Sequence, residues 1–338
     1  MTVIHPSTDE FAFTYGGVLP LASVEVGTGV QLFTEDCFSG RLDSAGLRPR
    51  DVGRFPYVNP LTGPIELRGV HKGDIVAIHL VSLKPARDWA VSTMSPNFGV
   101  LSGSRLAPNL QPPTEEHVWI WSVDAHAGVV HTASSDGQRI EAPLRPFHGT
   151  IGVAPAYGEV KLSVEPGAFG GNLDIPVLGE GATLYLKANV DGAFLSLGDG
   201  HFAQGEGEFA GTAVEGAMNT VFRTSTLPAD HPVAQQFDWP RIETDAEIIA
   251  VGCGKPLEDA YRVAVHSLVT WVAELTGMEA HDAYQLVSQG CTARLGNLVN
   301  PNYTVTVSLP KSLLPGQPMI MGGLHSSGFH GSEKGYQS

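Results

Sequence analysis

The chain is interrupted throughout by residues that end regular helices. Its 338 residues include 40 glycines and 24 prolines. In a helix interior, glycine costs about 1 kcal/mol and proline about 3 kcal/mol relative to alanine, whereas both are common in turns. Long helices are therefore expected to be few, and we predict a β-rich chain with some helix.

Two segments carry clear strand patterns. Residues 303–309 alternate apolar side chains with threonine and serine, which is the period of two that a strand produces. Residues 75–81 form an apolar run broken only by His79. Such a run predicts a strand that is buried on both faces.

A hairpin and a loop are expected in the middle of the chain. Segments 183–190 and 194–197 flank Asp191 and Gly192, and an aspartate–glycine pair suits a tight hairpin turn. The glycine-rich segment 199–211 follows and is expected to form a loop. Residues 84–113, which are rich in proline, glycine and serine, are expected to form long surface loops.

A helical hairpin is expected near the carboxyl end. Apolar side chains recur every three to four residues between Pro256, which suits a first helical position, and Gly277, which suits a helix stop. A second helix is expected over 279–289. The two helices should pack together on a sheet. The Gly/Ser-rich tail, residues 316–338, is expected to be mobile in a monomer.

Charge and cysteine content exclude several classes of protein. The formal net charge is −15, from 20 Lys and Arg against 35 Asp and Glu, which disfavours binding to nucleic acid or anionic membranes. The three cysteines include no CxxC pair, so neither a zinc finger nor a disulfide framework is indicated. With no signal-peptide pattern and no apolar run of about 18 residues, we expect a soluble cytoplasmic protein.

Two acidic motifs lie close together in the chain. Asp199 and His201 are two residues apart, so in extended chain they would point to one side, roughly 7 Å apart. A carboxylate and an imidazole placed in this way can bind one cation or polarise one water. Glu206 and Glu208 have the same spacing and can hold a metal or share a proton. Spacing alone favours a solvated loop and a polar turn at these places.

Other candidates are ambiguous by themselves. Gly170 and Gly171 expose backbone N–H groups next to Asn172 and Asp174, which suits either an oxyanion site or an ordinary turn. Asp36 follows an apolar-alternating stretch, and His148 stands alone, so both patterns more often have structural roles. The sequence contains no HExxH, no GxSxG elbow and no P-loop.

Taken together and in order, these motifs resemble the acetamidase/formamidase family. The similarity is colinear from about residue 24 to residue 314. The matching segments are 59–66, 73–75, 149–155, 166–167, 170–174, 178–181, 198–201, 204–208, Glu215, 283–288 and 309–311.

The resemblance implies a hydrolase that cleaves the C–N bond of small neutral amides such as formamide, acetamide or a small lactam. It also implies an α+β fold, β-rich with sandwich or barrel-like sheets, over a single domain 1–315 or two lobes, 1–155 and 156–315. A divalent metal is expected, zinc first, with calcium or manganese as alternatives. The protein is expected to be a homo-oligomer.

Residue roles follow from the resemblance together with the chemistry of each side chain. A bound metal would polarise the carbonyl and activate water. Phe169 stands where the family usually has histidine, so its ring is expected to select a less polar substrate. The candidates are Asp36, Asp199 and His201 as metal ligands; Glu208 as general base; Asn172, Gly170 and Gly171 for the oxyanion; Asp174 and Glu66 to orient this set; and Phe169 and His148 for substrate.

Two alternatives stay open at this point. One is a non-catalytic small-molecule-binding β-protein of the same fold, which the histidine replacement at Phe169 would favour. The other is a metal-free amidase with Cys37 as nucleophile, although a free cysteine is more often simply buried.

Overall fold

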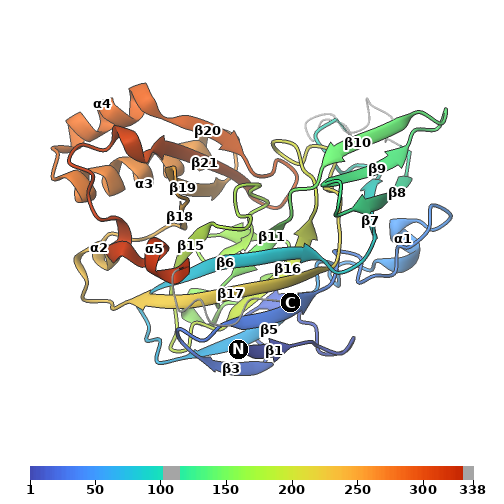
Figure 1. Cartoon of the computed structure of the whole chain (residues 1–338), viewed down its shortest axis with the longest axis horizontal. Coiled ribbons are helices and arrows are strands. Elements are labelled where there is room, and N and C mark those ends of the chain that lie inside the picture. Colours follow the sequence, from blue (N-terminus) through green and yellow to red (C-terminus); the bar gives the residue numbers. More distant parts are fainter. Residues whose placement is uncertain (102–114, 330–338) are drawn as a thin grey trace.

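The computed structural model describes residues 1–101 and 115–329. Most strands belong to two large sheets (Figure 1). Across the nine-stranded sheet the order is β1 (Thr2–Ile4), β4 (Val30–Thr34), β17 (Met218–Leu227), β6 (Ile75–Pro85), β15 (Thr183–Lys187), β18 (Arg241–Glu243), β19 (Glu247–Gly254), β21 (Tyr303–Pro310) and β20 (Thr292–Leu295).

The other sheets are smaller. The six-stranded sheet has the order β13 (Pro166–Gly167), β14 (Gly170–Asn172), β11 (Phe147–Gly152), β16 (Leu195–His201), β5 (Leu61–Arg68) and β3 (Ala22–Glu25). A four-stranded sheet contains β10 (Arg139–Pro143), β9 (Val129–Ala133), β8 (His117–Asp124) and β7 (Trp89–Met94). The last pair is β12 (Lys161–Leu162) with β2 (Thr14–Tyr15).

The main core lies between the two large sheets. Ile78 and Leu184 of the nine-stranded sheet share one buried cluster with Ile65, Ile151 and Leu197 of the six-stranded sheet. Apolar side chains from facing sheets pack in this way in a sandwich. The expected β-rich α+β fold is therefore confirmed.

A second core lies on the opposite face of the nine-stranded sheet. Ile75 and Ala77 of β6 point into it, whereas Val76 and Ile78 point into the main core. Because successive side chains of a strand face opposite ways, a strand between two cores must be apolar throughout. This explains the nearly continuous apolar run, broken only by His79, that predicted β6.

Helices cover this second core. Buried Leu268 and Trp271 of α3 contact the sheet there, and Val287 of α4 joins them. Figure 1 shows α3 and α4 at one end of the molecule, with the four-stranded sheet at the other. The helices are α1 (Pro49–Val52), α2 (Pro232–Gln235), α3 (Leu257–Thr276), α4 (Ala280–Gly290) and α5 (Leu324–Phe329), with short 3-10 turns η2 (Ala156–Gly158), η3 (Lys311–Leu313) and η4 (Ile320–Gly323).

The predicted helical hairpin is present, and its long helix starts one residue later than expected. Pro256 is the residue that precedes α3, and Gly277 ends it in the left-handed conformation with φ of 70°. Within the residues that the structure describes, no helix is both long and apolar enough to cross a membrane.

The expected hairpin around Asp191 and Gly192 is wrong. β15 pairs with β6 and β18 in the nine-stranded sheet, whereas β16 pairs with β11 and β5 in the six-stranded sheet. The turn therefore carries the chain from one sheet to the other. The two flanking strands pair with other strands and not with each other. A turn motif reports only local backbone preference, so it cannot predict which strands will pair.

Two segments expected to be irregular are partly regular. Residues 84–113 were expected to form surface loops, but β6 continues to Pro85 and β7 occupies Trp89–Met94. Residues 102–113 of this segment lie outside the described residues. Likewise, the expected tail from 316 forms η4 and α5 as far as residue 329, and its last nine residues lie outside the described part.

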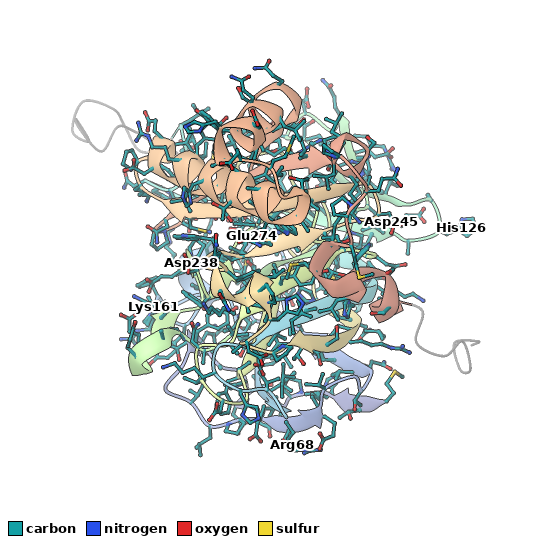
Figure 2. All side chains as sticks on the ribbon, turned by 90° about the vertical axis from the view of Figure 1, so that its left-hand side faces the viewer. Arg68, His126, Lys161, Asp238, Asp245 and Glu274 are labelled. Carbon is teal, nitrogen blue, oxygen red and sulfur yellow. The ribbon has the colours of Figure 1, made fainter. Side chains whose placement is uncertain are left out.

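A buried chain of polar groups attaches α5 to the nine-stranded sheet. His79 Nε2 contacts Ser225 Oγ at 2.6 Å, and His79 Nδ1 contacts Thr183 Oγ1 at 2.9 Å. Thr183 Oγ1 in turn contacts His325 Nδ1 at 2.8 Å, and His325 Nε2 lies 3.1 Å from Asp245. Figure 2 shows this side of the molecule, with Asp245 close to α5.

These contacts predict how stability depends on pH. Burial, with a contribution from His325, lowers the pKa of His79 from 6.5 to about 4. Between these values the unfolded chain binds a proton that the folded chain does not, so stability falls as pH falls from 6.5 toward 4. We expect wild type to lose about 3 kcal/mol more than His79→Asn over this range. Urea unfolding at several pH values measures this difference.

The control is His126→Asn, which changes an exposed histidine (Figure 2) and should keep the wild-type pH dependence. Equal pH dependence in wild type and His79→Asn would contradict the assignment of a neutral, buried ring to His79.

Candidate active site

Carboxylates, one imidazole and one thiol from distant parts of the chain converge beside β16. Asp199 and His201 end this strand, in the middle of the six-stranded sheet (Figure 1). The remaining members come from loops and strand ends. Two groups of side chains each offer ligand atoms within 4.8 Å of one another, and they comprise Cys37, Asp199 and Glu215, and Asp174, His201 and Glu208.

His201 is the centre of this cluster. Its Nε2 lies 3.2 Å from Glu215 Oε2, 3.4 Å from Asp199 Oδ2 and 4.0 Å from Glu208 Oε1. Both Asp199 and His201 are almost fully buried, with 2% and 0% of their surface exposed. The solvated loop that their spacing favoured is therefore wrong at these residues.

Several polar atoms of the cluster are buried without a hydrogen bond. In the described part of the chain, no partner is present for Asp174 Oδ1, Asp199 Oδ1, His201 Nε2 or Glu215 Oε2. Buried polar groups are nearly always paired, and unpaired buried charge costs several kcal/mol. These atoms belong to residues of the two ligand groups, so a cation bound there would compensate unpaired atoms of the cluster.

The backbone of the cluster is unusual as well. Asp174, Asp199 and Glu208 have positive φ values of 52°, 57° and 47°. Aspartate tolerates this region, but for glutamate it is uncommon, and each such residue costs on the order of 1–3 kcal/mol. The structure around these residues must therefore maintain this conformation.

A missing side chain leaves room at the centre. Gly149 lies in β11, directly beside β16, and a Cβ built on it would be 2.7 Å from Asp174 Oδ1, from Asp199 Oδ2 and from His201 Cε1. No real Cβ tolerates such contacts. Glycine at 149 therefore keeps open the space toward which the carboxylates and imidazole converge.

Gln204 fixes the orientation of His201. Its Nε2 donates to the carbonyl oxygens of Asp174 and Gly296 at 2.9 Å and 3.0 Å, so its Oε1 must face the imidazole. Oε1 lies 2.8 Å from His201 Nδ1 and can only accept, so Nδ1 carries the proton. His201 Nε2 is thereby turned toward the acids, which is how metal-binding histidines are usually held.

Amide and hydroxyl groups hold the acids in place. Asn59 Nδ2 donates to Asp199 Oδ2 at 2.9 Å, and Thr150 Oγ1 lies 3.1 Å from the same oxygen. Asn300 Nδ2 donates to Asp174 Oδ2 at 2.6 Å. Asn172 Oδ1 accepts from both Asn59 and Thr150. The result is a rigid set of oxygens rather than a flexible acidic patch.

The electrostatics of the cluster reflect crowding of negative charge. Burial, with Asp199, raises the pKa of Asp174 well above its usual range, and burial, with Asp174, does the same for Glu208. Burial raises the pKa of Glu215 to about 7. Burial alone would lower the pKa of His201, but Glu215 and Asp199 raise it well above its usual value. The cluster therefore attracts positive charge strongly.

The cluster opens into a cavity of about 450 Å³. Cys37, Asp199, Glu208 and Glu215 line it together with Asn172. A cavity of this size that combines apolar walls with a few convergent polar groups is the usual form of a small-molecule site.

The structure brings together five of the sequence-predicted site residues. Asp199, His201, Glu208 and Asp174 belong to the cluster, and Asn172 lines the cavity beside them. They come from strand ends and loops that the sheet holds close together.

Asp36 and Glu66 lie elsewhere. The Asp36 carboxylate is occupied by Arg87, at 2.6 Å, and by the backbone N–H groups of Phe38 and Gly40. Glu66 lies in β5 next to Gly192. Neither residue joins the cluster. Asp36 is paired with Arg87, and Glu66 lies at the place in β5 that faces the turn around Gly192.

The four residues predicted to bind substrate make packing and backbone contacts within the fold. Phe169 packs edge-on against Tyr15 in the core, with ring centroids 5.2 Å apart. His148 is buried with its ring between Gly198 O and Thr220 Oγ1. Gly170 and Gly171 pair with β11, and a Cβ at Gly171 would lie 2.1 Å from Glu165 O. The structure thus gives all four residues packing contacts.

Sequence reasoning missed several members of the site. Glu215 was noted only as part of a matching segment, and Gly149 and Gln204 only as motif positions. Asn59 was noted only as part of the matching segment 59–66, and Asn300 was not singled out. Asn59 and Asn300 act on acids more than 100 residues away, so only the fold brings these pairs together.

Comparisons with known proteins agree with this architecture. Residues 156–315 match the Acetamidase/Formamidase family. Among curated proteins, an acetamidase of Mycolicibacterium smegmatis is 24% identical over 241 residues, which cover 55% of this chain and 58% of that protein. The chain thus spans under two thirds of the length of the curated relatives it matches.

Solved structures match over nearly the whole chain. The crystal structure of an acetamidase from Bacillus halodurans is 28% identical, with a TM-score of 0.79 over 92% of this chain and 97% of that one. An acetamidase from Yersinia enterocolitica is 34% identical, with a TM-score of 0.83 and coverage of 93% of both chains. Sequence identity at this level over the full fold shows that the chain belongs to the acetamidase/formamidase family.

Proposed function

We propose that this chain hydrolyses the C–N bond of small neutral amides, producing a carboxylate and ammonia. The single observation that carries the proposal is the buried cluster around His201, which opens into a cavity of about 450 Å³. Membership of the family, whose matched relatives are named acetamidases and formamidases, supports the choice of an amide as substrate.

A divalent metal fits the residues that are present. The unpaired oxygens of Asp174, Asp199 and Glu215, with His201 Nε2, would hold it, and Gly149 leaves the space. Imidazole and carboxylates, with the Cys37 thiol nearby, favour zinc, and manganese or calcium are the alternatives. When bound, the metal would polarise the carbonyl and lower the pKa of a water.

Glu208 is the proposed proton carrier. It lines the cavity, and burial raises its pKa, which suits a group that both takes and returns a proton. The water oxygen bonds to the carbonyl carbon while its proton passes to Glu208. Glu208 then delivers the proton to the amide nitrogen, the C–N bond breaks, and ammonia leaves. Asn172, whose Oδ1 accepts from Asn59 and Thr150, can direct its amide N–H toward the carbonyl oxygen.

A metal-free amidase with Cys37 as nucleophile is the second candidate, because Cys37 lines the cavity. Burial and the charges of Glu215 and Asp199 raise the pKa of this thiol well above its usual value. A thiol in such surroundings is a poor nucleophile. Chelation separates the two mechanisms, because it would abolish metal-assisted turnover and leave a cysteine mechanism active.

The remaining expectations stay predictions. A binding protein without catalysis would show no ammonia release. The expected homo-oligomer would appear in light scattering as a particle heavier than one 35.8 kDa chain, and a cytoplasmic location would appear in fractionation.

Site variants should fall into two classes. Asp199→Asn and His201→Ala should each lower both metal content and ammonia release, the latter about 100-fold or more, since each removes a ligand. Glu208→Gln should lower turnover about 100-fold or more while metal stays bound, because it removes only the proton carrier. Elemental analysis and an ammonia assay with acetamide and formamide measure both quantities.

Full metal content and near-normal turnover in Asp199→Asn and His201→Ala would place the chemistry elsewhere. Absence of ammonia release by the metal-supplemented wild type across a broad amide panel would overturn the proposed function itself.

Gly149→Ala tests the space at the centre of the cluster. The added methyl group would collide with Asp174, Asp199 and His201, so metal binding and activity should fall about tenfold or more. Gly205→Ala is the matched control, because a Cβ there meets nothing within 4 Å. Calorimetric titration with zinc measures binding. Equal zinc affinity in the two variants would show that the cluster does not form the metal site.

Gln204→Met tests the orientation of His201. The change removes the acceptor of the Nδ1 proton at nearly constant volume, so metal affinity should fall about 10–100-fold. Gln285→Met, on the exposed face of α4, is the control and should bind metal normally. Unchanged affinity in Gln204→Met would mean that the imidazole needs no such support.

A further inference from the structure

The wall of the catalytic cavity is more apolar than a substrate as small as acetamide requires. Besides the acids, it contains aromatic and branched side chains from several separate segments of the chain. These are Phe38, Phe55, Val58, Phe98, Val164 and Val299. Segments that are far apart in sequence thus all contribute apolar side chains to the wall of one cavity.

This apolar lining extends from the interior to the mouth. Phe38 and Val299 are each 8% exposed, whereas Phe98 is 40% and Phe55 is 69% exposed. A ligand that reached from the cluster to the mouth would therefore meet apolar side chains along its length. Burial of that surface would contribute about 25 cal/mol for each Å² removed from water.

The volume of the cavity indicates a larger ligand as well. Acetamide has four non-hydrogen atoms, whereas cavities of about 300–1,000 Å³ usually hold drug-sized molecules. A cavity of about 450 Å³ would leave most of its wall wet if only acetamide were bound.

The polar groups decide which end of a larger amide lies where. The acids lie in two groups around His201, Asp199 with Glu215 and Asp174 with Glu208, and within each group the ligand atoms lie within 4.8 Å of one another. An amide NH₂ group can donate both of its hydrogens there, whereas an apolar substituent on nitrogen would be pressed against buried carboxylates. The apolar part of the substrate must then be on its acyl side.

We propose that the substrate is a primary amide whose acyl group carries an aromatic or branched alkyl substituent. This inference rests on the proposed amide hydrolysis at the same site. The amide carbonyl and NH₂ lie against the cluster, and the substituent extends along Phe38 and Val299 toward Phe98. Water adds its oxygen to the acyl carbon, the C–N bond breaks, and the products are an aryl- or alkyl-substituted carboxylate and ammonia.

A substrate series tests the inference in the metal-supplemented wild-type chain. Acetamide, butanamide, 3-methylbutanamide and 2-phenylacetamide differ only in the acyl group. We expect kcat/KM to rise along the series, by about 10-fold or more from acetamide to 2-phenylacetamide. N-benzylacetamide, which carries its ring on nitrogen, should be hydrolysed no faster than acetamide.

Two variants locate the effect in the cavity wall. Phe98→Ala should reduce the ratio of kcat/KM for 2-phenylacetamide to that for acetamide by about fivefold or more, because it removes an aromatic contact at the mouth. Val164→Phe should reduce the same ratio by filling the cavity. Tyr57→Ala is the control: Tyr57 is exposed near Phe55 but does not line the cavity, and its ratio should equal that of wild type.

The outcomes separate this inference from the proposed function. Release of ammonia from acetamide with a flat or falling series would overturn the substrate class and leave amide hydrolysis intact. A faster reaction of N-benzylacetamide than of 2-phenylacetamide would overturn the orientation. If none of the amides reacts, the proposed function fails, and the substrate class fails with it.

Discussion

The crowding of buried acidic side chains around one imidazole is the constraint on which the site depends. Asp174, Asp199, Glu208 and Glu215 lie around His201 with almost no access to water. Each carboxylate taken out of water costs several kcal/mol unless it is compensated. One imidazole cannot compensate four acids, and the unpaired oxygens show where positive charge is missing. A bound dication would resolve this conflict, and in the proposed mechanism one of the same acids carries the proton.

Only a stiff scaffold can keep such a cluster assembled. β16 lies between β11 and β5, and its hydrogen bonds to both fix Asp199 and His201 at its end. The main core packs beneath this sheet. The positive φ values of Asp174, Asp199 and Glu208 are then imposed by their surroundings. Strain and charge repulsion are thus concentrated in one small region and balanced by burial of apolar side chains elsewhere.

The cavity places two kinds of surface next to each other. In the proposed function, the acids that line the cavity would accept from an amide NH₂ group and carry a proton, while Phe38, Val299 and Phe98 provide an apolar wall. In small-molecule sites of this kind, polar groups fix the orientation of the ligand and apolar surface adds to its affinity. Phe169, whose ring was expected to select the substrate, packs on Tyr15, whereas the rings that line the cavity belong to other segments.

Local sequence determined the elements whose signals repeat along the chain. β6, β21 and the two C-terminal helices follow from periodicity, because burial on one or both faces dictates which positions are apolar. The motif that contains Asp199 and His201 marked the centre of the site. Sequence did not reveal that Asp36 pairs with Arg87, or that Glu215, Gln204 and Gly149 surround His201. Those contacts depend on which strands become neighbours. Strand pairing over long sequence distances is decided by packing across the whole sheet, and a short segment of sequence carries no information about that packing.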